Sequence, residues 1–85
     1  MPNIDIYTSS TCPYCIQAKK LLEAKNVSYT EKLIDTNPEF IAEAVERSGG
    51  RRTVPQIFIG DTHVGGYDEM AALDQKGQLD AMLSN

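Results

Sequence analysis

Tryptophan is absent from this 85-residue sequence, histidine occurs once and cysteine only twice. Long apolar runs are also missing, since no stretch approaches the ~20 consecutive apolar residues that a membrane-spanning helix needs. The N-terminal residues lead directly into a strand pattern, without the basic region and apolar run of a secretion signal. We therefore expect a cytoplasmic protein without a membrane anchor.

Basic charge is scarce as well, because eight basic residues stand against twelve acidic ones and the net charge is −4. Basic runs do not exceed two residues, as at Arg51 and Arg52, which is too short to follow a nucleic-acid backbone. No aromatic residues alternate with them for base stacking. We expect neither nucleic acid nor an anionic membrane as a partner. The hydrophobic content of 41% suffices for a core, so residues 1–85 are expected to form a single domain.

The two cysteines lie three residues apart, in Cys12-Pro13-Tyr14-Cys15, where an alternating strand pattern gives way to a helical one. Proline favours the first position of a helix, so Cys12 falls at about the N-cap and Cys15 on the first turn. Residues i and i+3 of a helix lie roughly 5–6 Å apart, which is within the distance that a disulfide tolerates. The N-terminus of a helix favours an anion, here the thiolate form of Cys12. Hydrogen bonds from backbone N–H groups to the Cys12 sulfur are expected to supply most of this stabilisation. We predict that Cys12 is an exposed nucleophile and that Cys15 is a less exposed resolving thiol.

Three other roles for this pair are weaker. A structural disulfide that closes only four residues would add about 2 kcal/mol, and cytoplasmic disulfides are usually catalytic. A structural zinc needs four ligands, whereas the pair supplies two and His63 lies in a distant segment. A cysteine–histidine hydrolase would need His63 beside Cys12, while an exposed position on a strand is the default for this histidine. We therefore favour a redox pair and expect no metal.

Hydrophobic patterning predicts an α/β domain. Strands are expected at residues 3–8, 27–34, 56–59 and 62–64, and helices at 13–25, 38–48, 67–76 and 79–83. The opening strand–helix–strand unit makes its two strands parallel and puts the cysteines at the carboxyl end of the first, where open α/β sheets place their chemistry. Thr36 or Asn37 is expected to cap the second helix. The helical residues expected to face the core include Ile16, Ala18, Leu21, Leu22, Phe40, Ile41, Ala44, Val45, Met70 and Leu73.

Two further segments have unusual backbone requirements. Pro55 cannot donate to a β-ladder, so it is expected at a strand end or a special turn, where a cis bond after Val54 is rare by frequency alone. Gly65 and Gly66 precede the third helix. Because glycine has no side chain, a ligand can approach the backbone closely at such a helix start, and the free N–H groups there bind anions. Asp68 is then either a first-turn acid favoured by the helix dipole or a ligand for an amine.

With these motifs in order, the sequence resembles a glutaredoxin of the thioredoxin-fold superfamily over essentially its whole length. The resemblance rests on Cys12-Pro13-Tyr14-Cys15 after the first strand, Thr53-Val54-Pro55 before the third, and Gly65-Gly66-Tyr67-Asp68 before the third helix. The size and the segment 53–59 are most similar to the short bacterial type 3 glutaredoxins. The resemblance implies a thioredoxin-like fold, with a four-stranded mixed sheet flanked by helices in the order βαβαββα, and a cis peptide at Pro55.

The resemblance also implies that glutathione is the reductant and co-substrate. In such proteins the residue matching Cys12 attacks a disulfide or a glutathionylated substrate, and a second glutathione or the thiol matching Cys15 resolves the product. Arg51 and Arg52 are alternatives for the glycyl carboxylate of glutathione, and Arg52 is retained in the predicted site. By position, the implied glutathione-binding residues are Tyr14, Arg52, Thr53, Val54, Pro55, Gly66 and Asp68.

The implied partners are glutathione and disulfide-bonded or glutathionylated proteins, with ribonucleotide reductase as one candidate client, and the protein is expected to be a monomer. Two other functions remain open. A redoxin recycled by thioredoxin reductase is less consistent with the absence of tryptophan, and a glutathione-assisted iron–sulfur cluster carrier is less consistent with Pro13. Many relatives have lysine or arginine three residues before the first cysteine, where this sequence has Ser9. Thiolate formation and glutathione binding are therefore expected to be weaker here.

Overall fold

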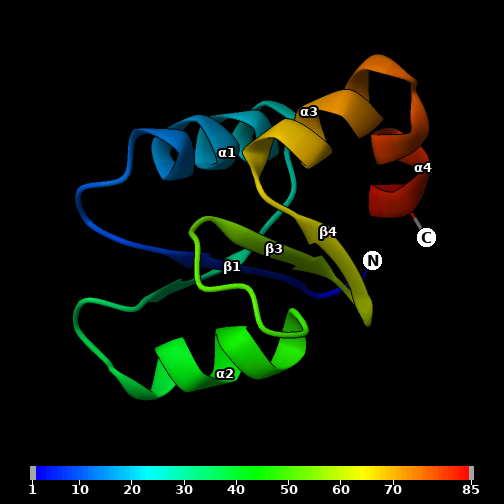
Figure 1. The fold of residues 1–85 in the computed structure, drawn as a ribbon. Helices are drawn as coiled ribbons and strands as arrows, with labels where there is room; N and C mark the ends of the chain where they lie inside the picture. Colours follow the sequence, from blue (N-terminus) through cyan, green and yellow to red (C-terminus); the bar gives the residue numbers. More distant parts are fainter. Residues whose placement is uncertain (1, 85) are drawn as a thin grey trace.

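The computed structural model describes residues 2–84 and contains a four-stranded mixed sheet with four helices (Figure 1). The sheet has the order β2-β1-β3-β4, in which β1 pairs parallel with β2 and antiparallel with β3, and β3 pairs antiparallel with β4. The predicted α/β architecture is therefore confirmed. Along the chain the elements are β1 (Ile4–Thr8), α1 (Pro13–Ala24), β2 (Thr30–Leu33), α2 (Glu39–Arg47), β3 (Gln56–Ile59), β4 (Thr62–Gly65), α3 (Tyr67–Gln75) and α4 (Gln78–Ser84).

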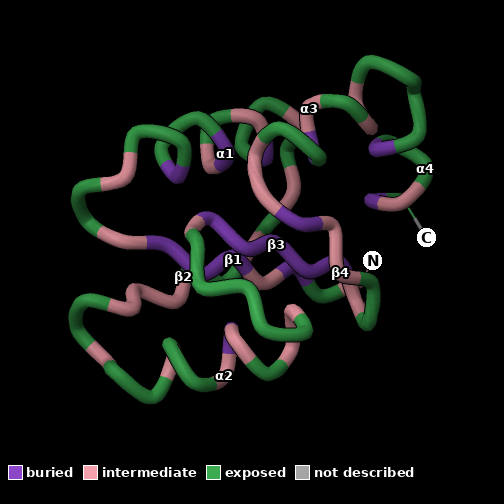
Figure 2. The backbone as a smooth tube through the Cα atoms, viewed as in Figure 1, coloured by how far each residue is buried: buried purple, intermediate pink, exposed green. Residues whose placement is uncertain are grey.

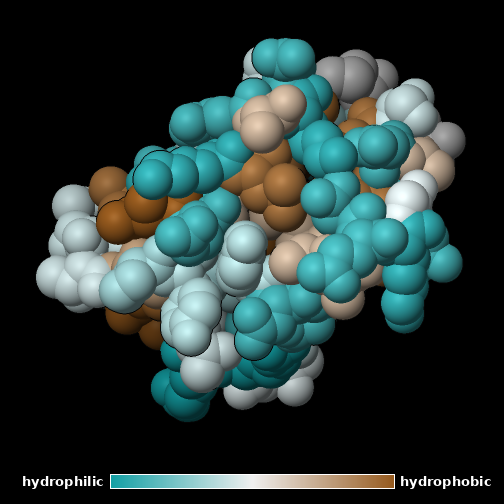
Figure 3. Space-filling model, turned by 90° about the horizontal axis from the view of Figure 1, so that it is seen from above, coloured by the Kyte–Doolittle hydropathy of each residue, from teal (hydrophilic) through white to brown (hydrophobic). Residues whose placement is uncertain are grey.

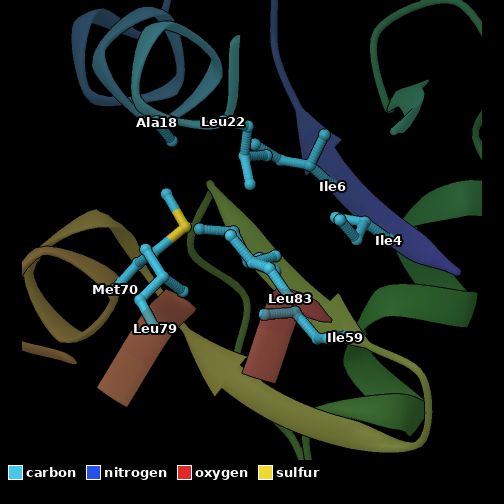
Figure 4. Packing of buried hydrophobic residues seen from close by; sticks show 9 residues of the cluster. Ile4, Ile6, Ala18, Leu22, Ile59, Met70, Leu79 and Leu83 are labelled. Atoms are coloured by element: carbon cyan, nitrogen blue, oxygen red, sulfur yellow. The ribbon is translucent and has the colours of Figure 1, made fainter. Parts of the chain in front are cut away.

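The helices form two layers around the sheet, with α1, α3 and α4 on one side and α2 on the other (Figure 1). The central strands β1 and β3 are the most completely buried parts of the chain (Figure 2). Their apolar side chains pack against α1, α3 and α4 in one cluster (Figure 4). This cluster contains Ile4, Ile6, Ala18, Leu22, Ile57, Ile59, Met70, Leu79 and Leu83.

A second cluster, beneath α2, combines aromatic packing with charge. Tyr7, which is completely buried, packs edge-on against Phe58 and Phe40, with ring centroids 5.7 Å and 6.4 Å apart. Its hydroxyl group donates to the Glu43 carboxylate and accepts a 2.8 Å hydrogen bond from Nη1 of Arg47. Burial and the hydrogen bond with Glu43 raise the pKa of Tyr7, so the hydroxyl stays protonated and can donate. This network ties α2 to the centre of the sheet.

The second strand is shorter than the pattern predicts, since residues 27–29 do not belong to it. Pairing between β1 and β2 begins only at Asp5 and Thr30, because the chain before that point is still returning from the end of α1. Asn26 marks this return with a positive φ of 59°. Val27 and Tyr29 nevertheless pack against the main core, which explains their apolar alternation.

Two of the apolar helix residues are not buried as predicted. Ile16 and Ile41 are 48% and 42% exposed. Ile16 lies on the solvent side of α1 with the exposed Lys20 and Glu23, away from the buried Cys15, Ala18 and Leu22. The helix boundaries agree more closely with the prediction. The side chain of Asn37, not that of Thr36, accepts the N–H of Glu39 at 3.2 Å, and the cis peptide between Val54 and Pro55 is present.

Candidate active site

The two cysteines lie where β1 delivers the chain into α1. Cys12 has an extended backbone conformation (φ −98°, ψ 110°) and caps the helix, while Pro13 occupies its first turn. The preceding loop is fixed by the carboxylate of Asp35, which accepts hydrogen bonds from the backbone N–H of Ser10, at 2.8 Å, and from its hydroxyl group. The predicted position of Cys12 at the helix start is confirmed.

The two thiols have different environments. The sulfur of Cys12 is partly exposed and accepts the backbone N–H of Cys15 at 3.2 Å, as expected for a thiol at a helix N-terminus. Its thiol group also lies 3.6 Å from the carbonyl oxygen of Val54, to which it donates. Cys15 is only 1% exposed, and burial, followed by its hydrogen bond with Cys12, raises the pKa of its thiol to about 12. Cys15 therefore stays protonated at neutral pH.

A groove of about 150 Å³ lies beside Cys12, whose sulfur contacts the lining residue Val54, at the end of the sheet where β1 and β4 finish and β3 begins. Three connections form it: the start of α1, the loop before β3 and the turn between β4 and α3 (Figure 1). Tyr14, which is 61% exposed, stacks on Tyr67 with ring centroids 6.4 Å apart at one wall. The lining residues are Tyr14, Arg51, Thr53, Val54, Pro55, Gly66, Tyr67, Asp68 and Glu69.

The groove contains every predicted glutathione-binding residue except Arg52. Arg52 instead lines a neighbouring depression over α2, together with Ile41, Val45 and Glu46. The groove contains Arg51, the alternative arginine, whose Nη1 lies 3.0 Å from Oε1 of Glu69. The sequence pattern could not choose between two adjacent arginines, because the loop before β3 has no regular periodicity that would assign a face to each.

The turn between β4 and α3 depends on Gly65, which has a φ of +112°. A Cβ atom at Gly65 would also lie only 2.6 Å from the carboxylate of Glu69. That carboxylate accepts the backbone N–H of Gly66 at 3.1 Å, and this bond, with the contact to Arg51, lowers the pKa of Glu69. Glu69 was not among the predicted site residues. The signal for it was a glutamate at the third position of the helix, the usual place of a capping-box acid.

Neither His63 nor Lys19 forms a hydrogen bond with Cys12 or Cys15. His63 is half-buried rather than exposed: its ring stacks on Phe58, and its Nε2 lies 2.7 Å from Oε1 of Gln56. Burial lowers the pKa of His63, and the imidazole contributes to the fold of the β3–β4 hairpin rather than activating Cys12. Lys19 forms an ion pair of 2.8 Å with Glu31.

Among residues 2–84, no helix is long and apolar enough to cross a bilayer. In the same part of the chain, no three side chains of histidine, cysteine, aspartate or glutamate are grouped closely enough to hold a metal ion.

A paired Cys-x-x-Cys at the start of the first helix, beside a cis-proline loop in a four-stranded mixed sheet, defines a thiol–disulfide redox protein with the thioredoxin-like fold. Comparison with known proteins narrows this class. The glutaredoxin family model matches residues 4–64. The chain is 54% identical to a glutaredoxin of Pseudomonas aeruginosa over 99% of both chains, and 53% identical to glutaredoxin 3 of Escherichia coli over 98% of this chain and 99% of that one.

The fold is also similar to that of a glutaredoxin of known structure. The crystal structure of a buckwheat glutaredoxin–glutathione complex superposes with a TM-score of 0.88 at 29% identity, covering 98% of this chain and 77% of that one. The chain belongs to the glutaredoxin family. It is a glutathione-dependent thiol–disulfide oxidoreductase, as the sequence resemblance implied.

Proposed function

We propose that Cys12 is the attacking thiol of this enzyme and that Cys15 is its resolving thiol. The observation that carries this assignment is the contrast between the two sulfurs. Cys12 is accessible and receives an N–H hydrogen bond at the helix start, whereas Cys15 is buried, with a pKa raised to about 12. A thiolate is the reactive form of cysteine, so the accessible sulfur stabilised by N–H donation is the nucleophile.

We further propose that the groove beside Cys12 binds glutathione. The backbone of Val54 pairs with the tripeptide as an added strand would, and Tyr14, Thr53 and Pro55 line that contact. Gly66 and Asp68 hold the γ-glutamyl end, with the Asp68 carboxylate taking the ammonium group. Arg51 takes the glycyl carboxylate, a role that its position in the groove favours over Arg52. The similarity of the fold to that of the buckwheat glutaredoxin–glutathione complex supports this placement.

The first step of the proposed reaction is thiol–disulfide exchange. The Cys12 thiolate attacks the glutathione sulfur of a protein–glutathione mixed disulfide, and the protein sulfur leaves as a thiolate that takes up a proton. Cys12 now carries glutathione through a disulfide bond. A second glutathione thiolate attacks the sulfur of the bound glutathione, which releases glutathione disulfide and restores the Cys12 thiolate. Each mixed disulfide reduced therefore consumes one glutathione thiol, because the other half of the released glutathione disulfide comes from the substrate.

A protein disulfide takes a second route. Cys12 attacks one sulfur of the client, and Cys15 then attacks Cys12 in the resulting mixed disulfide, which releases the reduced client and leaves a Cys12–Cys15 disulfide. Cys15 must lose its proton for this step. The formation of a disulfide at Cys12 favours that loss, because the hydrogen bond and charge of Cys12 both contribute to the raised pKa of Cys15.

Activity measurements on Cys12→Ser and Cys15→Ser test the assignment, with a glutathionylated peptide and a protein disulfide as separate substrates. Cys12→Ser should be inactive on both, because the attacking sulfur is gone. Cys15→Ser should keep activity on the glutathionylated peptide and lose it on the protein disulfide. Turnover by Cys12→Ser, or failure of the intact reduced protein to turn over the glutathionylated peptide, would contradict the proposal.

We also propose that the protein acts in the cytoplasm as a monomer without a resident metal, on glutathionylated or disulfide-bonded proteins such as ribonucleotide reductase. A hydrophobic area at the end of the molecule that carries the β1–α1 loop offers a contact surface for such clients (Figure 3). The half-exposed Ile16 belongs to the same helix as Cys12 and Tyr14. Visible absorbance after anaerobic purification, with sedimentation as a dimer, would instead favour the iron–sulfur carrier.

A further inference from the structure

The carboxylate of Glu69 occupies a position in the groove that would suit a carboxylate of a ligand. A single oxygen, Oε1, lies 3.0 Å from Nη1 of Arg51 and accepts the N–H of Gly66 at 3.1 Å. A guanidinium group and a backbone N–H at a helix start are the donors that proteins use to recognise carboxylates. In this structure both donors are already satisfied from within the chain.

The charge of the groove makes this contact important. Its lining contains one cation, Arg51, and two carboxylates, Asp68 and Glu69. Glutathione carries two carboxylates and one ammonium group at neutral pH, so it is a net anion entering a groove of net negative charge. The hydrogen bond from Gly66 and the contact with Arg51 lower the pKa of Glu69, which favours the charged form of this carboxylate.

We propose that Glu69 lowers the affinity of the groove for glutathione, because it competes with the glycyl carboxylate of glutathione for Arg51. This inference rests on the proposed placement of glutathione in the groove. Binding exchanges an internal ion pair for one with the ligand, so Glu69 weakens the retention of glutathione. The side chains of Arg51 and Glu69 are each 44% exposed, which gives both of them room to separate when the ligand enters.

Glu69→Gln isolates the charge from the helix cap. Glutamine keeps an oxygen that can accept the N–H of Gly66, and its length is the same, so the start of α3 is preserved. It removes the negative charge and frees the guanidinium of Arg51 for the ligand. Glu69→Ala would remove both contacts, and loss of stability would then obscure the effect on binding.

The experiment measures an equilibrium in a Cys15→Ser background, in which only the monothiol reaction occurs. The reduced protein reacts with glutathione disulfide to give the Cys12–glutathione mixed disulfide and one reduced glutathione, so no other oxidant is needed. Mass spectrometry gives the two protein species and hence the equilibrium constant. We expect Glu69→Gln to raise this constant about two- to five-fold at low salt, as expected for an exposed ion pair, and by less at high salt.

Three controls make the result specific. Glu23→Gln removes the same charge from the far end of α1 and should leave the constant unchanged. The disulfide of glutathione ethyl ester, whose glycyl carboxylates are blocked, should remove the effect of Glu69→Gln. The same should happen when Arg51→Gln is added, because the competition acts through that guanidinium group.

Each outcome bears on the inference separately from the proposed function. If the Cys15→Ser protein with Glu69 intact forms the mixed disulfide, but Glu69→Gln leaves its constant equal or lower, then Glu69 positions Arg51 for the ligand and the competition is refuted. An equal gain with the ethyl ester, or without Arg51, also refutes it. If the protein with Glu69 intact forms no mixed disulfide at all, the proposed glutathione site fails, and the inference fails with it.

Discussion

Cys15 provides a quantitative test of the difference between the two thiols. With a pKa of about 12, about one Cys15 thiol in 10⁵ is ionised at pH 7, whereas an ordinary cysteine with a pKa of about 8.5 is about 3% ionised. This difference lowers the population of the reactive thiolate roughly 3,000-fold, which the greater nucleophilicity of a more basic thiolate offsets only in part, and burial slows the reaction with an alkylating reagent further. We expect iodoacetamide to modify one thiol of the reduced, folded protein at pH 7, and we expect that thiol to be Cys12.

The assay is peptide fragmentation by mass spectrometry after timed alkylation. In urea, where burial is lost, both cysteines should react at comparable rates. The Cys12→Ser variant separates the causes: burial is the largest contribution to the raised pKa, so Cys15 should remain slow in this variant as long as the protein is folded. Modification of Cys15 before Cys12 in the folded protein, or at a similar rate, would refute the assignment of nucleophile and resolving thiol.

Two further predictions concern the surroundings of the thiols. Ser9→Lys introduces a cation three residues before Cys12, where the family resemblance implies one, and should increase alkylation of Cys12 below neutral pH or tighten glutathione binding; if neither changes, residue 9 does not influence the thiol or the glutathione site. Arg47→Met keeps the packing over Phe58 but loses the hydrogen bonds to Asp5 and Tyr7, and should lower the free energy of unfolding by about 1–2 kcal/mol in urea. An unchanged urea midpoint would show that this network does not stabilise α2.

The arrangement of the elements could be read from the sequence because each has its own periodicity. The alternation in β1 and the helical spacing of Ala18 and Leu22 specify opposite sides of one core, and the structure places them in one cluster. The limit of this reasoning is visible at Val27 and Tyr29. They alternate like strand residues and are partly buried, but they have no strand partner, and pairing is a tertiary property that periodicity does not contain.

In the site, too, the features that depend on local sequence were predicted, whereas those that depend on tertiary contacts were not. The position of Cys12 followed from a proline and a change of pattern, both of which are local in the sequence. The contact between Arg51 and Glu69 joins residues 18 positions apart, and the hairpin of β3 and β4 brings them together. A glutamate three positions after a helix cap is an ordinary stabilising residue in sequence terms. Only the folded loop before β3 shows that the same carboxylate also binds an arginine of the groove.

The groups proposed to bind glutathione already have partners in the free protein. The Val54 carbonyl oxygen accepts the Cys12 thiol, and the Gly66 N–H and the Arg51 guanidinium contact Glu69. Binding therefore exchanges hydrogen bonds rather than adding them, and such exchange contributes little net free energy. Formation of the Cys12–glutathione disulfide removes the thiol proton, which frees the Val54 carbonyl for the backbone of the attached tripeptide. The covalent step and the strand-like contact thus favour each other, whereas free glutathione must compete with the thiol for the same carbonyl. An enzyme that must release glutathione disulfide in every cycle benefits from this difference, because its product no longer has the covalent bond that made the contact favourable.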